Sequence, residues 1–164
     1  MSHTFAKERV VFIKFKGVAD MYGLFDMIFG WMMKNKFINF NEDVYKTKIP
    51  EIERKWTAYQ QRTEYVQETV VFECHFWGVK PVEVVKDGKK QKLYQFRGQI
   101  ELSYIIDTDW EGNWEKSEFW VRLRNFYDSY IIKNRLLFLY VVPLEEKMLG
   151  LAKDIKEFLG MEGE

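Results

Sequence analysis

One acidic residue interrupts an otherwise apolar face in the middle of the chain. From Val66 to Phe76 apolar residues alternate with polar ones, a pattern typical of a half-buried strand, and Glu68 falls on the apolar face. A carboxylate there must find partners or take up a proton, because burial raises its pKa. Glu68 could therefore orient a ligand or act as a general acid or base. The alternative, which we prefer, is that it lies near the exposed end of its strand and snorkels or bonds to a lysine.

The remaining nucleophilic and metal-binding side chains are few. Cys74 is the only cysteine, and its neighbour His75 points to the opposite face of the same strand, so the two should not form a thiolate pair. We expect Cys74 to be buried and inert. Two histidines and one cysteine are too few for a zinc site of either kind, and no glycine-rich phosphate loop is present. The sequence therefore predicts no catalytic set, no metal and no cofactor.

An acidic segment, 107–118, has the ligand spacing of a calcium loop. Asp107, Asp109 and Glu111 occupy its first, third and fifth positions, with Gly112 sixth and Glu118 twelfth. Against calcium, the preceding segment predicts a strand where such loops follow a helix, and an aromatic residue holds the eighth position. An acidic turn that opens a helix explains the same residues. Both interpretations stay open at this point.

Composition limits the classes of function. The 164 residues are the length of one domain, and we expect a single domain over 1–164. Equal numbers of acidic and basic residues, 25 each, give no net field for a polyanion, so nucleic acid is not an expected partner. The first nine residues lack the apolar core of a secretion signal, and the lone cysteine suits a reducing compartment, so we expect a cytoplasmic protein. The apolar run 18–33 is too short and too charged for stable membrane insertion.

Hydrophobic periodicity predicts the elements that position these residues. We expect strands over 9–16, 44–49, 54–62, 66–76, 82–85 and 94–106. Asp87-Gly88 predicts a two-residue hairpin turn, and the strand after it places one apolar face against one polar face. The cluster at 39–43 predicts a turn.

Helical spacing follows the first strand and returns near the C-terminus. A helix is expected from Asp20. Gly23 and Gly30 share one face of it, so either another element packs closely against that face or the helix is deformable there. A second helical pattern begins at Trp114 with Asn113 as N-cap. The run 135–142 fits strand or helix, with helix preferred, and Pro143 should kink the helix or start another turn.

This order of elements resembles the helix-grip fold of the START and Bet v 1-like proteins, which include polyketide cyclases. The resemblance covers nearly the whole chain and rests on element order. It implies an α+β fold: a curved antiparallel sheet of five to seven strands packed on a long C-terminal helix, with a helical insert after the first strand. In such families a cavity between sheet and helix holds lipids, sterols or aromatic polyketides.

A ligand pocket is the leading functional hypothesis. It would bind an apolar or aromatic small molecule, and Met combined with aromatic rings gives an adaptable lining. Its predicted lining is Met21, Phe25, Ile28, Met32, Glu68, Phe72, Phe76, Tyr94, Phe96, Leu102 and Tyr104. These residues could equally well fill a solid core. A weak enzyme would use Glu68, Tyr94 or Tyr104.

An interaction module is the competing hypothesis. Its surplus aromatics, Trp56, Trp77, Trp110 and Trp114, would form a surface for a partner or for a homodimer, over a packed core that holds no ligand. A nucleic-acid platform needs exposed rings with a basic rim, whereas rings and charges lie on opposite faces of 92–106.

Overall fold

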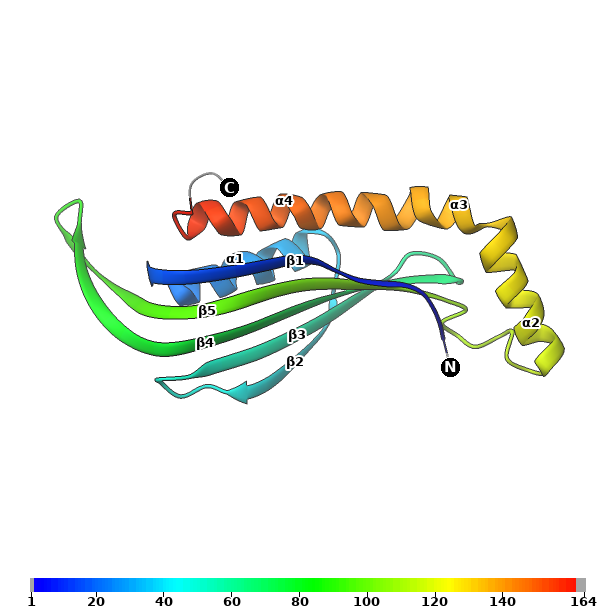
Figure 1. Ribbon diagram of the computed structural model, residues 1–164, viewed down its shortest axis with the longest axis horizontal. Helices are drawn as coiled ribbons and strands as arrows, with labels where there is room; N and C mark the ends of the chain where they lie inside the picture. The colour runs from blue at the N-terminus through cyan, green and yellow to red at the C-terminus, as the bar shows by residue number, and fades with distance from the viewer. Residues whose placement is uncertain (1, 162–164) are drawn as a thin grey trace.

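One curved antiparallel sheet carries two helical segments on the same face (Figure 1). The computed structural model describes residues 2–161. The strands are β1 (His3–Ala19), β2 (Asn39–Lys46), β3 (Ile52–Gln61), β4 (Val66–Lys86) and β5 (Lys89–Thr108). Their order across the sheet is β1-β5-β4-β3-β2, with every neighbouring pair antiparallel. The first strand therefore crosses over to pair with the last, and consecutive strands make the rest.

Two helical segments complete the fold. The first, α1 (Met21–Lys34), follows β1 directly. The second is a run of α2 (Glu118–Phe126), η1 (Tyr127–Ile131), α3 (Lys133–Leu136), η2 (Leu137–Val141) and α4 (Val142–Phe158). The two η segments are π-turns, which accommodate an extra residue and so shift the buried face of the helix that follows. The predicted fold class is confirmed: a curved antiparallel sheet, a helix after the first strand and a long C-terminal helix.

The long helix bends at one residue. Ile132 leaves helical geometry, with φ −107° and ψ 1°, and separates α2–η1 from the segment that continues into α4. Figure 1 shows α2 standing at a steep angle to α4, beyond the end of the sheet. The run 135–142 is helical, as preferred from its pattern, and Pro143 is the second residue of α4, which continues directly from η2.

Two local predictions are wrong. The cluster at 39–43, predicted as a turn, forms most of β2. Backbone hydrogen bonds to β3 hold it in the sheet, and its polar residues gave no sign of this pairing. The second helical segment begins at Glu118 after Ser117, not at Trp114 after Asn113. The Asn113 amide donates to Glu111 (2.8 Å) instead.

The two glycines of α1 have different environments. A Cβ at Gly23 would lie 2.3 Å from the carboxylate of Asp20, whose Oδ1 accepts the Gly23 N–H as the N-cap, and 3.2 Å from the ring of Phe158. No atom lies within 4 Å of a Cβ built at Gly30. The N-cap carboxylate of Asp20 and, next to it, the ring of Phe158 on α4 explain Gly23, whereas no close contact explains Gly30.

The β4–β5 hairpin has the predicted turn and a glycine at a close approach. Asp87 and Gly88 both have positive φ (53° and 73°), the conformation that a two-residue hairpin turn requires. Further along β5, a Cβ at Gly98 would come within 2.3 Å of the His75 carbonyl oxygen and 2.4 Å of the Phe76 ring. Only glycine lets the ring lie flat against the strand here.

The core lies between the inner face of the sheet and the helices. The inner face is the one turned toward α1 and α4, and its side chains are almost fully buried, among them Phe72, Phe76 and Ile100 at 0% exposure. The opposite, outer face carries charged residues and no covering element within residues 2–161. No helix in that range combines the length and the apolar character needed to cross a membrane.

Candidate functional site

The predicted pocket residues come together in the core. All eleven are buried, and they join the inner face of the sheet to the buried side of α1. The ring of Phe25 is central: its centroid lies 5.9 Å from that of Phe76, 6.4 Å from Phe72 and 5.7 Å from Trp56. These rings contact one another directly, so a ligand among them would have to displace at least one ring. The ligand-binding role of these residues stays a prediction.

Glu68 lies in the same layer, below α4. Glu68 is 5% exposed. The nearest cation is Arg62, whose Nε lies 3.9 Å from Glu68 Oε1. Burial raises the pKa of Glu68 above its ordinary value, while the charges of Arg62 and Lys147 oppose the rise. The carboxylate is more deeply buried than the preferred snorkelling interpretation implied.

Tyr104 is tied to the C-terminal helix. Its hydroxyl donates to Glu145 Oε1 at 2.7 Å, and burial together with this bond raises its pKa. A hydroxyl held in this way serves to attach α4 to β5. Cys74 is 3% exposed and burial raises the pKa of its thiol to about 12, as expected for an inert cysteine.

A buried polar network lies where the sheet meets η1. Asp128 is 1% exposed and accepts a hydrogen bond from the Tyr65 hydroxyl and another from the Thr108 hydroxyl, both at 2.6 Å. His3 Nδ1 lies 3.3 Å from the same carboxylate. Thr108 is 0% exposed, so no substrate reaches it, and the network fastens η1 to β4 and β5.

The acidic segment after β5 forms a second attachment. The Asp109 carboxylate is 2% exposed, accepts from the Trp114 backbone N–H (3.2 and 3.3 Å) and pairs with Arg124 Nη1 at 3.3 Å. Asp107 accepts from the Thr4 hydroxyl at 2.9 Å. These acids bond to the protein itself, and residues 2–161 contain no cluster of three or more histidine, cysteine or acidic side chains that could hold a metal ion.

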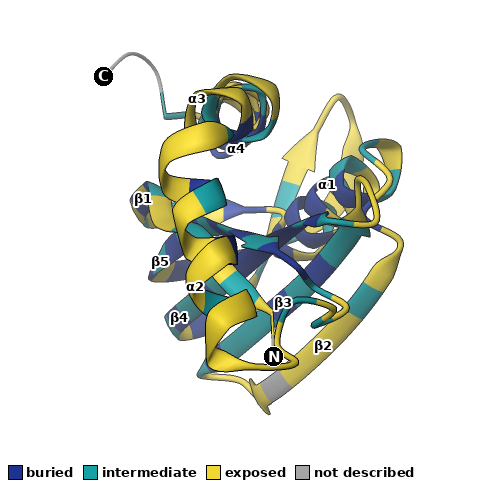
Figure 2. Cartoon of the chain, turned by 90° about the vertical axis from the view of Figure 1, so that its right-hand side faces the viewer, coloured by how far each residue is buried: buried dark blue, intermediate teal, exposed yellow. Residues whose placement is uncertain are grey.

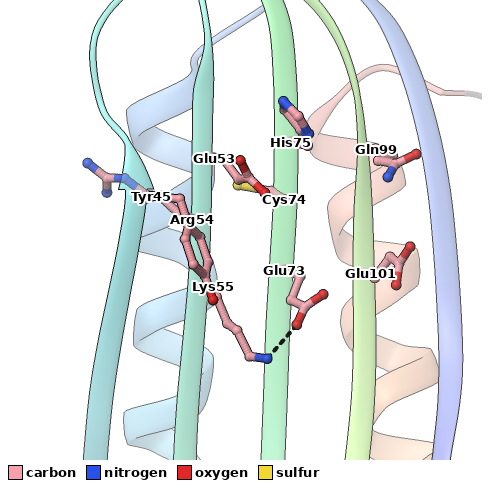
Figure 3. A pocket seen from close by; sticks show the side chains of 9 residues that line it. All are labelled: Tyr45, Glu53, Arg54, Lys55, Glu73, Cys74, His75, Gln99 and Glu101. Carbon is pink, nitrogen blue, oxygen red and sulfur yellow. Dashed lines mark ion pairs between the residues drawn. The ribbon is translucent and has the colours of Figure 1, made fainter.

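The outer face holds a shallow trough of charged residues (Figure 3). It has a volume of about 190 Å³ and is lined by Tyr45, Glu53, Arg54, Lys55, Glu73, Cys74, His75, Gln99 and Glu101. Lys55 pairs with Glu73 at 2.8 Å, and His75 Nε2 lies 2.5 Å from Glu51. Because these charges neutralise one another, the trough offers little to a ligand of either sign.

A cleft separates the start of β4 from the bent helix. It encloses about 270 Å³ and is lined by Thr63, Tyr65, Val66, Tyr127, Ile132, Arg135, Leu136, Leu139 and Tyr140. Its walls are aromatic and aliphatic, with Arg135 as the only charged group of the lining. The sequence did not predict this cleft, because it arises where the helix bends.

The most unusual surface is the side of α2–η1 that faces solvent. We call it the helical apolar face; it comprises Phe119, Trp120, Leu123, Phe126, Tyr130 and Ile131, which are 37–77% exposed. The only buried residues of α2 and η1 are charged, Arg124 and Asp128, at 5% and 1% exposure. The helix therefore buries two charged side chains while its large apolar side chains are exposed alongside Glu118 and Arg122. Figure 2 shows that most of α2 is exposed.

The four tryptophans of the competing hypothesis lie in separate places. Trp56 is buried in the core at 4% exposure, Trp77 lies half-buried on the outer face, and the Trp110 indole donates to the Thr63 carbonyl at 2.9 Å. Trp114 stacks on Tyr127 with centroids 6.0 Å apart, next to the helical apolar face. They form no common surface. The periodicity of 120–131 predicted a helix but not that its apolar stripe is exposed, since nothing in the sequence identifies Arg124 and Asp128 as the buried side.

Comparison with known proteins adds no assignment. Neither a protein-family model nor a curated protein matches this chain.

Proposed function

We propose that this protein is a self-association module whose helical apolar face docks on the same face of a second copy. The helix α2–η1 carries the proposal. This helix, which buries Arg124 and Asp128, leaves 37–77% of the surface of six large apolar residues in water in the isolated chain. An exposed apolar patch of this kind is typical of an interaction surface.

The size of the face supports a protein partner. With about 200 Å² for each of the six side chains when fully exposed, their exposed fractions leave roughly 700 Å² in contact with water. That exceeds the largest apolar patch of a typical monomer, roughly 300–600 Å². It approaches the roughly 800 Å² that each partner buries in a stable interface.

The charges beside the face favour a second copy in antiparallel orientation. The N-terminal end of the helix carries Glu115, Lys116 and Glu118, a net charge of −1, with Arg122 one turn further on at 3.9 Å from Glu118. Lys133 and Arg135 lie just beyond its C-terminal end. Antiparallel packing brings the acidic end of one copy beside the basic end of the other, and a two-fold axis makes both contacts at once. Parallel packing would place like charges together.

The test is the mass in solution as a function of concentration. Wild-type protein should sediment as a dimer that dissociates on dilution. Phe126→Glu with Tyr130→Glu should be monomeric with an unchanged circular dichroism spectrum, because both side chains are exposed. Ile38→Glu is the matched control: this residue is 70% exposed but lies outside the face, so the dimer should persist. A wild-type monomer at every concentration would overturn the proposal.

A second candidate function is the binding of an apolar or aromatic small molecule. The cleft beside Tyr65 favours it, since apolar walls with one cation suit a hydrophobic carboxylate. Native mass spectrometry of the purified protein tests for such a ligand. A bound carboxylate should raise the melting temperature of wild type but not of Arg135→Gln. If instead the ligand occupies the core layer around Phe25 and Phe72, Arg135→Gln should be stabilised as much as wild type.

A further inference from the structure

The charges of this electrically neutral chain are unevenly distributed. The segment Trp77–Arg97, which we call the basic hairpin, contains six lysines or arginines (Lys80, Lys86, Lys89, Lys90, Lys92 and Arg97) and two acids (Glu83 and Asp87). Its net charge is therefore +4, and the rest of the chain carries −4. Figure 1 shows the far end of this hairpin projecting beyond α1 and α4, at the opposite end of the molecule from α2.

Two lysines of β1 extend this charge across the outer face. In the sheet register Lys16 lies opposite Arg97, and Arg97 lies opposite Trp77, so the three form one row across β1, β5 and β4. Lys14 begins the next row along, and Lys80 lies two residues past the β-bulge at Gly78. Among residues 2–161 none of these four cations makes an ion pair. Their charge is therefore available to a partner.

Trp77 supplies an aromatic surface within the basic row. Its indole stacks on His75, with centroids 4.0 Å apart and planes at 29°. Two adjoining hollows meet at Trp77 and Arg97: one of about 420 Å³ also borders Gly78 and Lys80, and one of about 410 Å³ also borders Lys14. The outer face thus combines a half-buried aromatic ring with a rim of cations. The sequence pattern of β5 alone lacks this combination, because the ring here comes from β4.

The hairpin tip repels itself in the folded protein. Lys86 and Lys89 are the closing pair of the turn and lie directly opposite each other, an arrangement that is destabilising between like charges. Glu83 lies opposite Lys92, and Asp87 is in the turn itself, which leaves Lys90 as a third unbalanced charge. A bound anion would remove this repulsion. Two other acids lie near Trp77: Glu51, whose carboxylate contacts His75, and Glu53, which lies opposite His75. Glu73 and Glu101 lie further along the strands in the trough.

We propose that the basic hairpin, with Trp77, Lys14 and Lys16, binds single-stranded nucleic acid. The cations of this site that lie on the outer face are Lys14, Lys16, Lys80 and Arg97 around Trp77, and Lys86 and Lys89 at the tip. They would contact a phosphate backbone while an unpaired base stacks at Trp77. Two hollows flanking one ring suit successive bases. A duplex would keep its bases stacked on each other and away from Trp77.

The test is fluorescence anisotropy with labelled oligo(dT) and oligo(U) of equal length, titrated with the full chain at several salt concentrations. Lys16→Glu with Arg97→Glu should weaken binding and lower the slope of log K against log salt by about 1.4, since about 0.7 is lost for each phosphate contact. Trp77→Leu should weaken binding roughly 5- to 150-fold at every salt concentration. Preference between the two oligonucleotides identifies DNA or RNA as the natural strand.

Two variants guard against misfolding and nonspecific charge effects. Lys86→Glu with Lys89→Glu changes only exposed residues of the outer face at the tip and should also weaken binding. Lys7→Glu is the matched control: it lies on β1 on the same outer face, at the far end from the basic hairpin, and should bind as wild type. The proposal is overturned by absence of wild-type binding at low salt, by equal loss in Lys7→Glu, or by binding to phosphatidylserine vesicles but not to either oligonucleotide.

Discussion

Removal of the Asp128 carboxylate should detach α2–η1 from the sheet. Asp128 is 1% exposed, and its two oxygens accept hydrogen bonds at 2.6 Å from Tyr65 and Thr108, while His3 lies 3.3 Å away. The substitution Asp128→Ala removes the acceptor of both hydroxyl groups, of which that of Thr108 is fully buried and that of Tyr65 belongs to a half-buried residue. Because Thr108 is 0% exposed, water cannot replace the lost acceptor, and the His3 carbonyl oxygen at 3.4 Å offers only a longer bond.

The expected loss follows from these two bonds. A hydrogen bond to a charged group contributes about 1.5–3 kcal/mol, and breaking a buried charged network costs about 3–5 kcal/mol in total. For a domain of this length that corresponds to a fall in melting temperature of roughly 10 °C. Asp128→Asn keeps the shape and can still bond to both hydroxyls as a neutral group, so its loss should be about half as large.

Urea unfolding and hydrogen exchange measure the two parts of this prediction. Unfolding gives the lost free energy, and exchange should accelerate over 118–131 more than over α4, because the network fastens only the first part of the bent helix. Asp107→Ala is the control, since its bond to Thr4 lies at an exposed site and should contribute less than about 1 kcal/mol. A loss in Asp128→Ala no larger than in this control, or uniform exchange, would refute the assigned role.

Three further predictions concern the sheet and α4. Gly98→Ala should destabilise the protein by about 1–3 kcal/mol in urea unfolding, because its Cβ would lie 2.3 Å from the His75 carbonyl oxygen; an unchanged midpoint would contradict this packing. Tyr104→Phe should cost about 1.5–3 kcal/mol by losing the 2.7 Å bond to Glu145, and Glu145→Gln, which keeps a neutral acceptor, should cost less. Glu68 has a raised folded pKa, so its contribution to stability is present below its unfolded pKa and is lost as pH rises through the folded value. Glu68→Gln should therefore be more stable than wild type at pH 7 and no more stable near pH 4; equal stability at both would show that the carboxylate is not desolvated.

Period-two patterns predicted the central sheet well because each strand buries one face. From Tyr94 to Ile106 a register shift by one residue would expose every apolar side chain, so the sequence could encode only one pairing. The same argument fails for β2, where only Phe40 among residues 39–43 is partly buried and the remaining residues are exposed and polar. Edge strands of this kind carry little information in their side chains.

The buried side of the C-terminal helical segment could be predicted from its periodicity for α4 but not for α2–η1. The apolar stripe of α4, with Leu144 and Ile155, faces the sheet as the pattern implies. In α2–η1 an equally regular apolar stripe faces water. The opposite side of the helix is buried instead, because Arg124 donates a hydrogen bond to Asp109 and Asp128 accepts one from Thr108 at the end of the sheet. Such buried polar pairs depend on contacts between distant segments, which one sequence does not reveal.

The two proposed surfaces lie at opposite ends of the longest axis, and this separation makes them compatible. The helical apolar face is at the α2 end and the tip of the basic hairpin at the other (Figure 1). A two-fold dimer through α2–η1 would therefore leave both hairpins uncovered, pointing outward from the shared interface. Two strand-binding sites held in one particle increase the affinity for a strand long enough to reach both, without any new contact. Self-association through the helical apolar face would in this way raise the affinity of a basic surface that is small in each copy.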